Sequence, residues 1–251
     1  MSVVLQSPRE CQQWRRQQQG SVGFVPTMGA LHSGHAELLR RARQENDRVV
    51  LSIFVNPTQF NDPQDLQKYP KTWEQDVALA REHGVDAIFY PRYDDMYPDG
   101  YRYKVTENQF SLLLDGAHRP GHFDGVLSVV MKLLNLVAPH KAYFGEKDFQ
   151  QLTLIQGMVQ SFFMPLEVVP VPTVREDDGL AKSSRNIRLS PLERQKAPAI
   201  YKALRESTTA EEAARRLTEQ GFIVDYVTDI HSRRFVAAKL GEVRLIDNVE
   251  I

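Results

Sequence analysis

Two histidines three residues apart, His32 and His35, lie in a glycine-bearing segment, PTMGALHSGHAELLRRAR, at residues 26–43. The apolar residues before this segment predict a short strand, and the helical spacing of apolar residues within it predicts a helix. Gly29 and Gly34 let the backbone approach a ligand closely, and the first N–H groups of a helix are unpaired donors at the positive end of its dipole. This geometry suits phosphate, and imidazoles add side-chain donors. The segment therefore predicts a nucleotide site.

Two other interpretations of these histidines remain open. They could be ordinary surface or helix-capping residues, or they could be half of a metal site. The single cysteine, Cys11, offers no thiolate cluster, and no HExxH helix occurs in the chain, so the sequence identifies no metal ligands.

Amide, cationic and imidazole side chains follow in two further segments at or near predicted strand ends. Asn56 and Gln59, in NPTQF, offer amide donors and acceptors to a small polar substrate, although Asn-Pro is also common in plain turns. Arg119, in RPGHF, could hold an anion while His122 caps or orients, and a surface turn is the alternative.

Charged and hydroxyl side chains gather in two later segments. In GEKDFQQ, Lys147 is a point charge for phosphates, and Asp148 suits a helix N-cap or a contact to a sugar hydroxyl. The string KSSRN, at residues 182–186, combines two hydroxyls and two cations, as expected of a mobile phosphate clamp. Solvated charged turns are the alternative for each, but together with the HxGH turn these segments are the parts of a nucleotidyl-transfer site.

Three common catalytic motifs are missing from the sequence. The chain has no GxxxxGK[ST] P-loop, no GxGxxG dinucleotide fingerprint and no GxSxG nucleophile elbow. A hydride-transfer enzyme or a serine hydrolase therefore has little support.

Alternating strands and helices must position these residues. The predicted strands lie at residues 22–25, 48–55, 86–90, 142–144 and 166–169, with amphipathic helical spacing between them. This βα alternation predicts a doubly wound parallel sheet with helices on both faces, and ligands of such sheets bind beyond the carboxyl ends of the strands.

The pattern changes after Pro172. Residues 174–190 are polar and without periodicity, which predicts a loop, and Pro191 opens a helix. Residues 210–219 predict a second helix, and alternation at 222–226 and 243–245 predicts a small antiparallel sheet. We therefore expect two domains, a nucleotide- and substrate-binding domain at 1–173 and a smaller α+β lid domain at 174–251.

Composition and charge are those of an ordinary soluble globular protein. The chain has 251 residues, 42% hydrophobic and 25% charged, and 31 Lys plus Arg against 32 Asp plus Glu. This balance predicts no nucleic-acid or membrane surface. A lone cysteine cannot form an intramolecular disulfide, and the first residues show no signal peptide, so we expect a cytoplasmic protein.

Five strings resemble a known family in combination and in order: PTMGALHSGH, SIFVNPTQF, RPGHFDGV, FGEKDFQQL and VREDDGLAKSSRN. They are similar to pantothenate synthetase (pantoate–β-alanine ligase), of the HxGH nucleotidylyl-transferase superfamily. The resemblance covers residues 21–190 and implies a Rossmann-like fold. It also implies ATP-dependent condensation of pantoate with β-alanine through a pantoyl adenylate, releasing AMP and pyrophosphate. Mg²⁺ and a homodimer are further expectations from the resemblance.

The resemblance implies particular site residues. The ATP-binding residues would be Met28, Gly29, Ala30, Leu31, His32, Ser33, Gly34, His35, Gly145, Glu146, Lys147, Asp148, Val174, Lys182, Ser183, Ser184 and Arg185. Pantoate and β-alanine would be bound by Gln59, Gln151, Pro26, Asn56 and Arg119. The donors expected to act in catalysis are His32, His35, Lys147, Ser183, Ser184 and Arg185.

Lys182 departs from the family pattern, which usually has Met before SSRN. If the position contributes mainly backbone, the change is tolerable, and an added cation could strengthen phosphate binding. Two other functions stay open: an HxGH adenylyltransferase acting on a phosphomonoester, and a non-catalytic nucleotide-binding protein.

Overall fold

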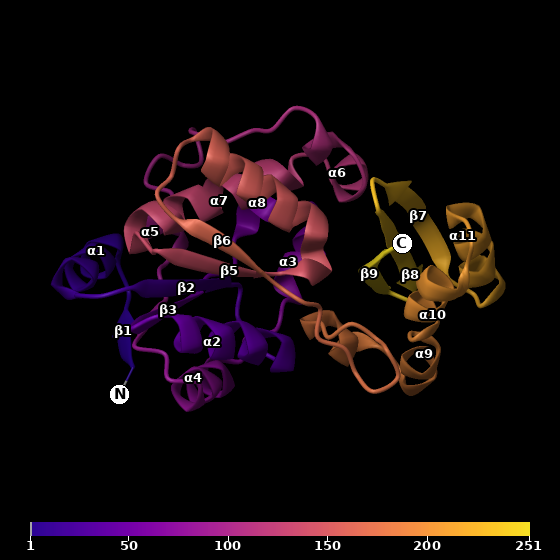
Figure 1. The fold of residues 1–251 in the computed structure, drawn as a ribbon, viewed down its shortest axis with the longest axis horizontal. Helices are drawn as coiled ribbons and strands as arrows, with labels where there is room; N and C mark the ends of the chain where they lie inside the picture. The colour runs from indigo at the N-terminus through magenta and orange to yellow at the C-terminus, as the bar shows by residue number, and fades with distance from the viewer. Residues whose placement is uncertain (1) are drawn as a thin grey trace.

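A six-stranded parallel sheet forms the larger part of the protein in the computed structural model, which describes residues 2–251 (Figure 1). Its strands are β1 (Val3–Leu5), β2 (Val22–Thr27), β3 (Arg48–Ile53), β4 (Ala87–Phe89), β5 (Lys141–Gly145) and β6 (Glu167–Val171), in the order β1-β4-β3-β2-β5-β6. After β2 the chain first builds one side of the sheet through β3 and β4, and then returns to build the other side through β5. The topological switch point, where such sheets bind ligands, therefore lies between β2 and β5.

Helices cover both faces of this sheet (Figure 1). The helices within residues 2–173 are α1 (Pro8–Gln17), α2 (Ser33–Glu45), α3 (Pro63–Gln67), α4 (Trp73–Glu82), α5 (Tyr93–Met96), α6 (Asp115–His118), α7 (His122–Val137) and α8 (Phe149–Ser161). Because side chains alternate along a strand, Phe24 of β2 packs into one core with α7 and α8, whereas Val25 packs into a second core with α2 and α4. The near-continuous apolar strands follow from burial on both faces.

A second, antiparallel sheet lies at the C-terminal end of the chain (Figure 1). It consists of β7 (Ile223–Ile230), β8 (Arg233–Leu240) and β9 (Val243–Glu250), preceded by α9 (Pro191–Lys196), α10 (Ala199–Glu206) and α11 (Ala210–Glu219). Its apolar core is drawn from residues between Leu180 and Val249 and is separate from the cores of the parallel sheet. The predicted fold, a doubly wound parallel sheet followed by a smaller α+β part, is confirmed.

Some elements differ from the prediction. Neither β1, α1 nor β8 was expected, and β6 and β7 extend beyond the predicted bounds. The polar segment after β6 is irregular as predicted, although an isolated bridge joins Arg175 to Ala181 and a 3-10 helix covers Ser184–Arg188. No helix within residues 2–251 is long and apolar enough to cross a membrane.

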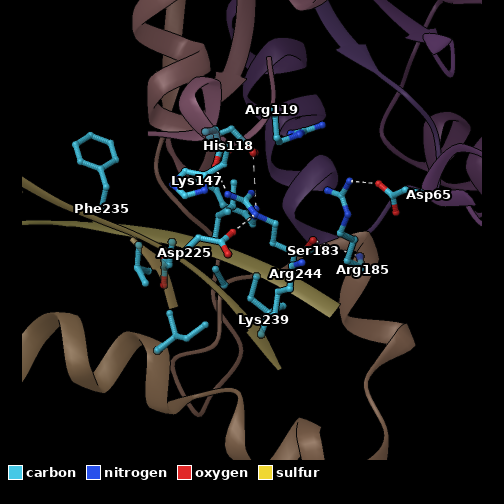
Figure 2. Close-up of a pocket in the computed structure, with 18 of the residues that line it drawn as sticks. Asp65, His118, Arg119, Lys147, Ser183, Arg185, Asp225, Phe235, Lys239 and Arg244 are labelled. Carbon is cyan, nitrogen blue, oxygen red and sulfur yellow. Dashed lines mark hydrogen bonds and ion pairs between the residues drawn. The ribbon is translucent and has the colours of Figure 1, made fainter. Parts of the chain in front are cut away.

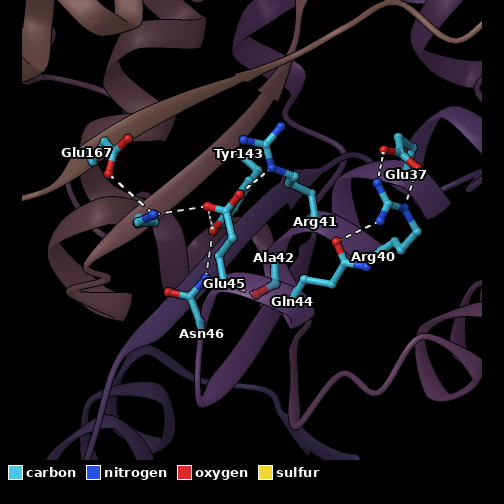
Figure 3. Close-up of polar contacts among 10 residues, drawn as sticks. Glu37, Arg40, Arg41, Ala42, Gln44, Glu45, Asn46, Tyr143 and Glu167 are labelled. Carbon is cyan, nitrogen blue, oxygen red and sulfur yellow. Dashed lines mark hydrogen bonds and ion pairs between the residues drawn. The ribbon is translucent and has the colours of Figure 1, made fainter.

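The C-terminal end of α2 is fixed by a charged cluster (Figure 3). Glu45 accepts hydrogen bonds from Arg41, from Lys141 Nζ at 3.0 Å and from Tyr143 Oη at 3.1 Å. Asn46 in turn donates to Tyr143 Oη at 2.7 Å. The cluster ties α2 to Lys141, the first residue of β5, and to Tyr143 in the middle of that strand. It therefore fixes the orientation of α2 relative to the sheet, and with it the position of the N-terminal end of the helix.

Candidate active site

The HxGH turn joins the end of β2 to the start of α2. Gly29 has φ +83°, a conformation that favours glycine, and Ala30 also has a positive φ, 52°. The carboxylate of Asp76, a residue of α4 that is 2% exposed, accepts the N–H groups of Ala30 at 3.0 Å and Leu31 at 2.8 Å. A buried carboxylate therefore binds the N–H groups of both residues in this structure, and ATP binding by Ala30 and Leu31 stays a prediction.

The two histidines cap α2 reciprocally. His32 is the N-cap residue, and its Nδ1 accepts the N–H of Gly34 at 3.1 Å, while Nδ1 of His35 accepts the N–H of His32 at 3.3 Å. The ring centroids are 4.2 Å apart. A neutral imidazole whose Nδ1 accepts a hydrogen bond carries its proton on Nε2. Each ring can therefore donate one hydrogen bond from Nε2.

Burial keeps both rings neutral. It lowers the pKa of His32 to about 4, with a further contribution from the nearby cations Lys147 and Lys182. It lowers the pKa of His35 to about 3, with contributions from His32 and Lys147. At neutral pH these side chains are uncharged donors, and the positive charge of this region comes from lysine and arginine.

A cavity of about 240 Å³ lies where β2 and β5 end, as the switch point predicts. Most of the predicted site residues line it: Pro26, Met28, His32, Gly34, His35, Gln59, Gly145, Lys147, Asp148, Gln151, Val174, Lys182, Ser183, Ser184 and Arg185. Seven predicted residues do not line it: Gly29, Ala30, Leu31, Ser33, Glu146, Asn56 and Arg119. The structure thus brings four distant segments to one cavity.

Asn56 does not line the cavity, but it contacts Gln59, which does. It is 1% exposed and caps the 3-10 turn Pro57–Gln59, and its Nδ2 donates to Gln59 Oε1 and to Gly125 O, both at 3.1 Å. Tyr97 Oη donates to Asn56 Oδ1 at 2.9 Å. The side chain that we expected at the substrate is therefore engaged by protein groups, and it orients Gln59.

A close backbone approach fixes the same turn. A Cβ on Gly125 of α7 would lie 2.4 Å from the carbonyl oxygen of Thr58, so only glycine fits there. Arg119 Nη2 and His122 Nδ1 donate to the carbonyl of Gln59 at 3.1 and 2.8 Å. Burial lowers the pKa of Arg119 to about 10, so its guanidinium stays charged at neutral pH.

Arg119 lines a second, larger cavity of about 660 Å³ between the parallel sheet and the C-terminal sheet (Figure 2). Lys147, Asp148, Gln151, Ser183 and Arg185 line both cavities. The two cavities are therefore adjacent, and they meet at these shared residues.

The cations of the KSSRN segment have carboxylate partners. Lys182 Nζ binds Glu176 Oε2 at 2.7 Å, and its backbone N–H donates to Val174 O at 2.9 Å. Arg185 binds Asp65 of α3 at 2.9 Å, as Figure 2 shows, and the same carboxylate binds Arg188 at 2.9 Å. Sequence reasoning identified the cations but not Glu176, Asp65 or Asp76, because no local spacing connects them to the motifs.

The described residues contain no cluster of three or more His, Cys, Asp or Glu side chains placed to hold a metal ion. Asp148, with a side chain 49% exposed and 3.8 Å from Lys147 Nζ, is the carboxylate lining the smaller cavity among residues 2–251. Mg²⁺ typically binds one or two carboxylates together with substrate phosphates and water. The single carboxylate of Asp148, together with substrate phosphates and water, fits this kind of Mg²⁺ coordination.

A doubly wound sheet with hydrogen-bond donors and cations at its switch point defines a nucleotide-binding α/β protein. The model of one family, Pantoate-beta-alanine ligase, matches residues 3–250. The chain belongs to this family, so it is a ligase that joins pantoate and β-alanine at the expense of ATP. The predicted family and reaction are confirmed, and the two alternative functions lose their support.

Relatives and solved structures agree with this assignment. A pantothenate synthetase from Bdellovibrio bacteriovorus is 76% identical over 251 residues, which cover all of both chains. One from Legionella pneumophila strain Lens is 51% identical over 91% of this chain and 90% of its own. A crystal structure of pantoate-beta-alanine ligase from Francisella tularensis, complexed with "Beta-gamma ATP" and β-alanine, has a TM-score of 0.95 and 40% identity, covering 100% and 98% of the two chains.

Proposed function

We propose that this enzyme activates pantoate as an acyl adenylate in the smaller cavity. The observation that supports this is the convergence of two neutral Nε2–H donors, His32 and His35, with Lys147 at the carboxyl ends of β2 and β5. Pantoate's carboxylate is ionised at neutral pH, so it attacks the α-phosphorus of ATP without a general base. A carboxylate oxygen–phosphorus bond forms as the bond to pyrophosphate breaks.

The protein's part in this step is positioning and charge stabilisation. We assign ATP to the HxGH turn, to Gly145–Asp148, and to Val174 with the segment 182–185. His32, His35, Lys147, Ser183, Ser184 and Arg185 would donate to the phosphoryl oxygens. Arg185 would exchange Asp65 for phosphate, because the triphosphate offers a higher negative charge than one carboxylate.

We assign pantoate to Gln59 and Gln151, with Pro26 beside them, since these residues line the smaller cavity. Asn56 and Arg119 act indirectly, through Gln59. Asn56 donates a hydrogen bond to the Gln59 side chain, and Arg119 donates one to the Gln59 carbonyl. Both are positioning residues rather than ligands of the substrate in this proposal.

The second step uses β-alanine, whose amine attacks the acyl carbon of the adenylate. A carbon–nitrogen bond forms and the carbon–oxygen bond to AMP breaks, while the ammonium group releases two of its three protons to solvent and the amide nitrogen keeps the third. β-Alanine would enter through the larger cavity, because this cavity adjoins the smaller one at Lys147 and Gln151. Mg²⁺, if held by Asp148 and the phosphates, would neutralise charge on the departing pyrophosphate.

We also infer the coarser organisation. Separate apolar cores support a division into domains at 1–173 and 174–251. The buried Cys11 carries a free thiol, which suits a reducing cytoplasm. A homodimer is expected from the family resemblance, and light scattering on the purified protein tests it.

Isotope exchange tests the two-step mechanism. Enzyme, Mg²⁺, ATP and pantoate should move labelled pyrophosphate into ATP with no β-alanine present, because the first step is complete in itself. Omitting pantoate is the control and should abolish exchange. Exchange that strictly requires β-alanine would contradict the acyl adenylate.

A further inference from the structure

Two consecutive residues of β9, Asp247 and Asn248, connect the C-terminal sheet to the proposed phosphate-binding segments. Both are buried, with exposed fractions of 4% and 3%. Asn248 Nδ2 donates to the carbonyl oxygens of Glu146 and Lys147, each at 2.9 Å. Asp247 accepts two hydrogen bonds from Arg175, at 2.6 and 2.9 Å. Polar side chains that are so buried and that also bind groups outside their own sheet indicate a role beyond that sheet.

The contacts of Asn248 fix the backbone on both sides of one lysine. The carbonyl of Glu146 belongs to the peptide plane before the Cα of Lys147, and the carbonyl of Lys147 belongs to the plane after it. Because peptide units are planar, holding both carbonyls restricts both backbone dihedrals of Lys147. The direction in which its side chain leaves the backbone is therefore set from the C-terminal sheet.

The orientation of the Asn248 amide is itself determined. Its Oδ1 accepts a hydrogen bond from Arg233 Nη1 at 2.6 Å, so the opposite rotamer would place Nδ2 against the guanidinium and Oδ1 against two carbonyls. Arg233 in turn stacks on the ring of Phe149, with 3.9 Å between the guanidinium carbon and the ring centroid. Arg233 and Asn248 thus lie against the start of α8, directly after the lysine turn.

Asp247 acts on the other segment through Arg175. Arg175 also donates to Gly179 O at 3.1 Å and forms the bridge with Ala181, so it closes the turn from which Lys182 and the following serines leave. The Asp247–Arg175 pair is nearly removed from water, with side chains 3% and 19% exposed. Neighbouring residues of one strand thereby hold the two segments.

We propose that Asn248 is a positioning residue for Lys147, and that Asp247 has the same role for the 182–185 segment through Arg175. The spacing between the two phosphate-binding segments is then set by β9, so the C-terminal sheet serves adenylate formation as well as covering the site. The inference rests on the role of Lys147 in the proposed function.

Asn248→Asp is the test variant, because it preserves size and the acceptor for Arg233 but replaces the donor to the two carbonyls with a carboxylate oxygen. Displacement of a catalytic group by about 1 Å costs up to ~100-fold. We expect kcat of pyrophosphate exchange to fall about 10- to 100-fold while KM for ATP changes less, since the loss falls mainly in the transition state. An exchange rate within twofold of the parent would overturn the proposal.

A double-mutant cycle separates positioning from general destabilisation. In a Lys147→Ala background, Asn248→Asp should lower the remaining exchange less than about threefold, because its target is gone. Effects that multiply would show that Asn248 acts elsewhere and would overturn the proposal. If Lys147→Ala alone left exchange intact, the proposed function itself would fail, and this outcome is read from the single variant.

A matched control removes a different contact between the same two parts of the protein. Tyr226 of β7 donates to Asp115 of α6 at 2.9 Å, and neither residue lines the smaller cavity, although both line the larger one. Tyr226→Phe should lower the unfolding midpoint about as much as Asn248→Asp and leave exchange within twofold. Equal loss of exchange in both variants would overturn the specific role. If Asn248→Asp does not fold, Asn248→Ser, which keeps one donor at reduced length, takes its place in the cycle.

Discussion

The two ends of α2 and of the neighbouring β5 use charge in opposite ways. At the C-terminal end of α2, the carboxylate of Glu45 is bound by Arg41, Lys141 and Tyr143 (Figure 3). At the N-terminal end, His32 and His35 accept backbone N–H groups at Nδ1 and stay neutral, and we propose that their Nε2 atoms donate to a ligand. At the C-terminal end of α2 the polar groups pair with one another and stabilise the fold, whereas at the N-terminal end hydrogen-bond donors remain available.

β5 carries this contrast in a single strand. Lys141 begins the strand and binds Glu45 at 3.0 Å, whereas Lys147 follows its other end and lines the cavity. Two lysines six positions apart should therefore have separable roles, one in stability and the other in catalysis. The predictions below test that separation.

The largest expected effect is on catalysis at the cavity end. Lys147→Ala and His35→Ala should each lower the rate of pyrophosphate exchange by about 10²–10³-fold, because each removes a donor to the transition state. Exchange kinetics with ATP and pantoate measure this, and circular dichroism checks that the fold is kept. Lys141→Ala is the matched control and should keep exchange within twofold. Near-parental turnover in Lys147→Ala would remove the contrast.

The two ends should also lose stability in different pH ranges. The folded-state pKa of His32 is about 4 and that of His35 about 3, against 6.5 for the free side chain, so the unfolded chain binds more protons. The contribution of the neutral histidines to the free energy of unfolding is complete above pH 6.5 and is lost as the pH drops toward 4. The loss is roughly 2 kcal/mol per histidine at pH 5. Urea unfolding from pH 7.5 to 4.5 measures the decline.

At the C-terminal end of α2, the contribution of Glu45 to stability is lost over a lower pH range. Hydrogen bonding from Arg41 and Lys141 lowers the pKa of Glu45 from 4.5 to about 2, so its contribution is present above pH 4.5 and is lost only below that value. His35→Gln should therefore make the decline between pH 6.5 and 4.5 shallower, and Glu45→Gln should leave its slope unchanged. A steeper decline in His35→Gln would contradict the assignment.

A smaller effect is expected from the amide at the cavity. Gln59→Ala should lower both exchange and overall synthesis about tenfold, as expected for one or two neutral hydrogen bonds. Gln44→Ala, which removes the partner of Arg40 near the opposite end of α2, should change neither. Exchange unaffected by Gln59→Ala would leave the mechanism standing and would remove Gln59 from the pantoate site.

The smallest effect is expected at Lys182. Lys182→Met should change exchange less than tenfold, or about 1.4 kcal/mol, because the ammonium is already paired with Glu176 and the backbone contact to Val174 does not depend on the side chain. The KM for ATP at low and high salt measures the contribution of the charge. A loss greater than tenfold would show that Lys182 is essential in this chain.

Local periodicity was sufficient to predict most of the fold. Strands β2 to β5 were found because burial on both faces makes them continuous apolar runs, whereas β6 is an edge strand with alternating burial and was found from its apolar residues alone. β1 has three residues and pairs only with the distant β4, so nothing near it in the sequence marks it. β8 was missed because it is the central strand of the antiparallel sheet and is buried on both faces over most of its length, which removes the alternation that marked its neighbours.

The site was predictable where chemistry and position coincide in the sequence. His32, Lys147 and Gln59 follow strand ends, and all line the cavity. Positioning residues outside the motifs were not recognised, because an acidic or amide residue far along the chain carries no local signal. Asp76 and Asn248 belong to this group. Asn56 was identified, but its burial and its contacts to Gln59 and Tyr97 could not be inferred from a turn sequence.

The neutral state of the two histidines has a consequence for turnover after chemistry. Pyrophosphate leaves with several negative charges, and every fixed cation in the site slows its departure by Coulomb attraction. If His32 and His35 contact the phosphates as proposed, an uncharged imidazole with one Nε2–H would stabilise the developing charge through a directional hydrogen bond, without adding a full positive charge to the product complex. Nδ1 of each ring already accepts a backbone N–H, so a proton could bind there only if that hydrogen bond were broken. The rings are therefore also held in the neutral state beside the charged product. In the proposed mechanism, the capping bonds that begin α2 would therefore also ease product release.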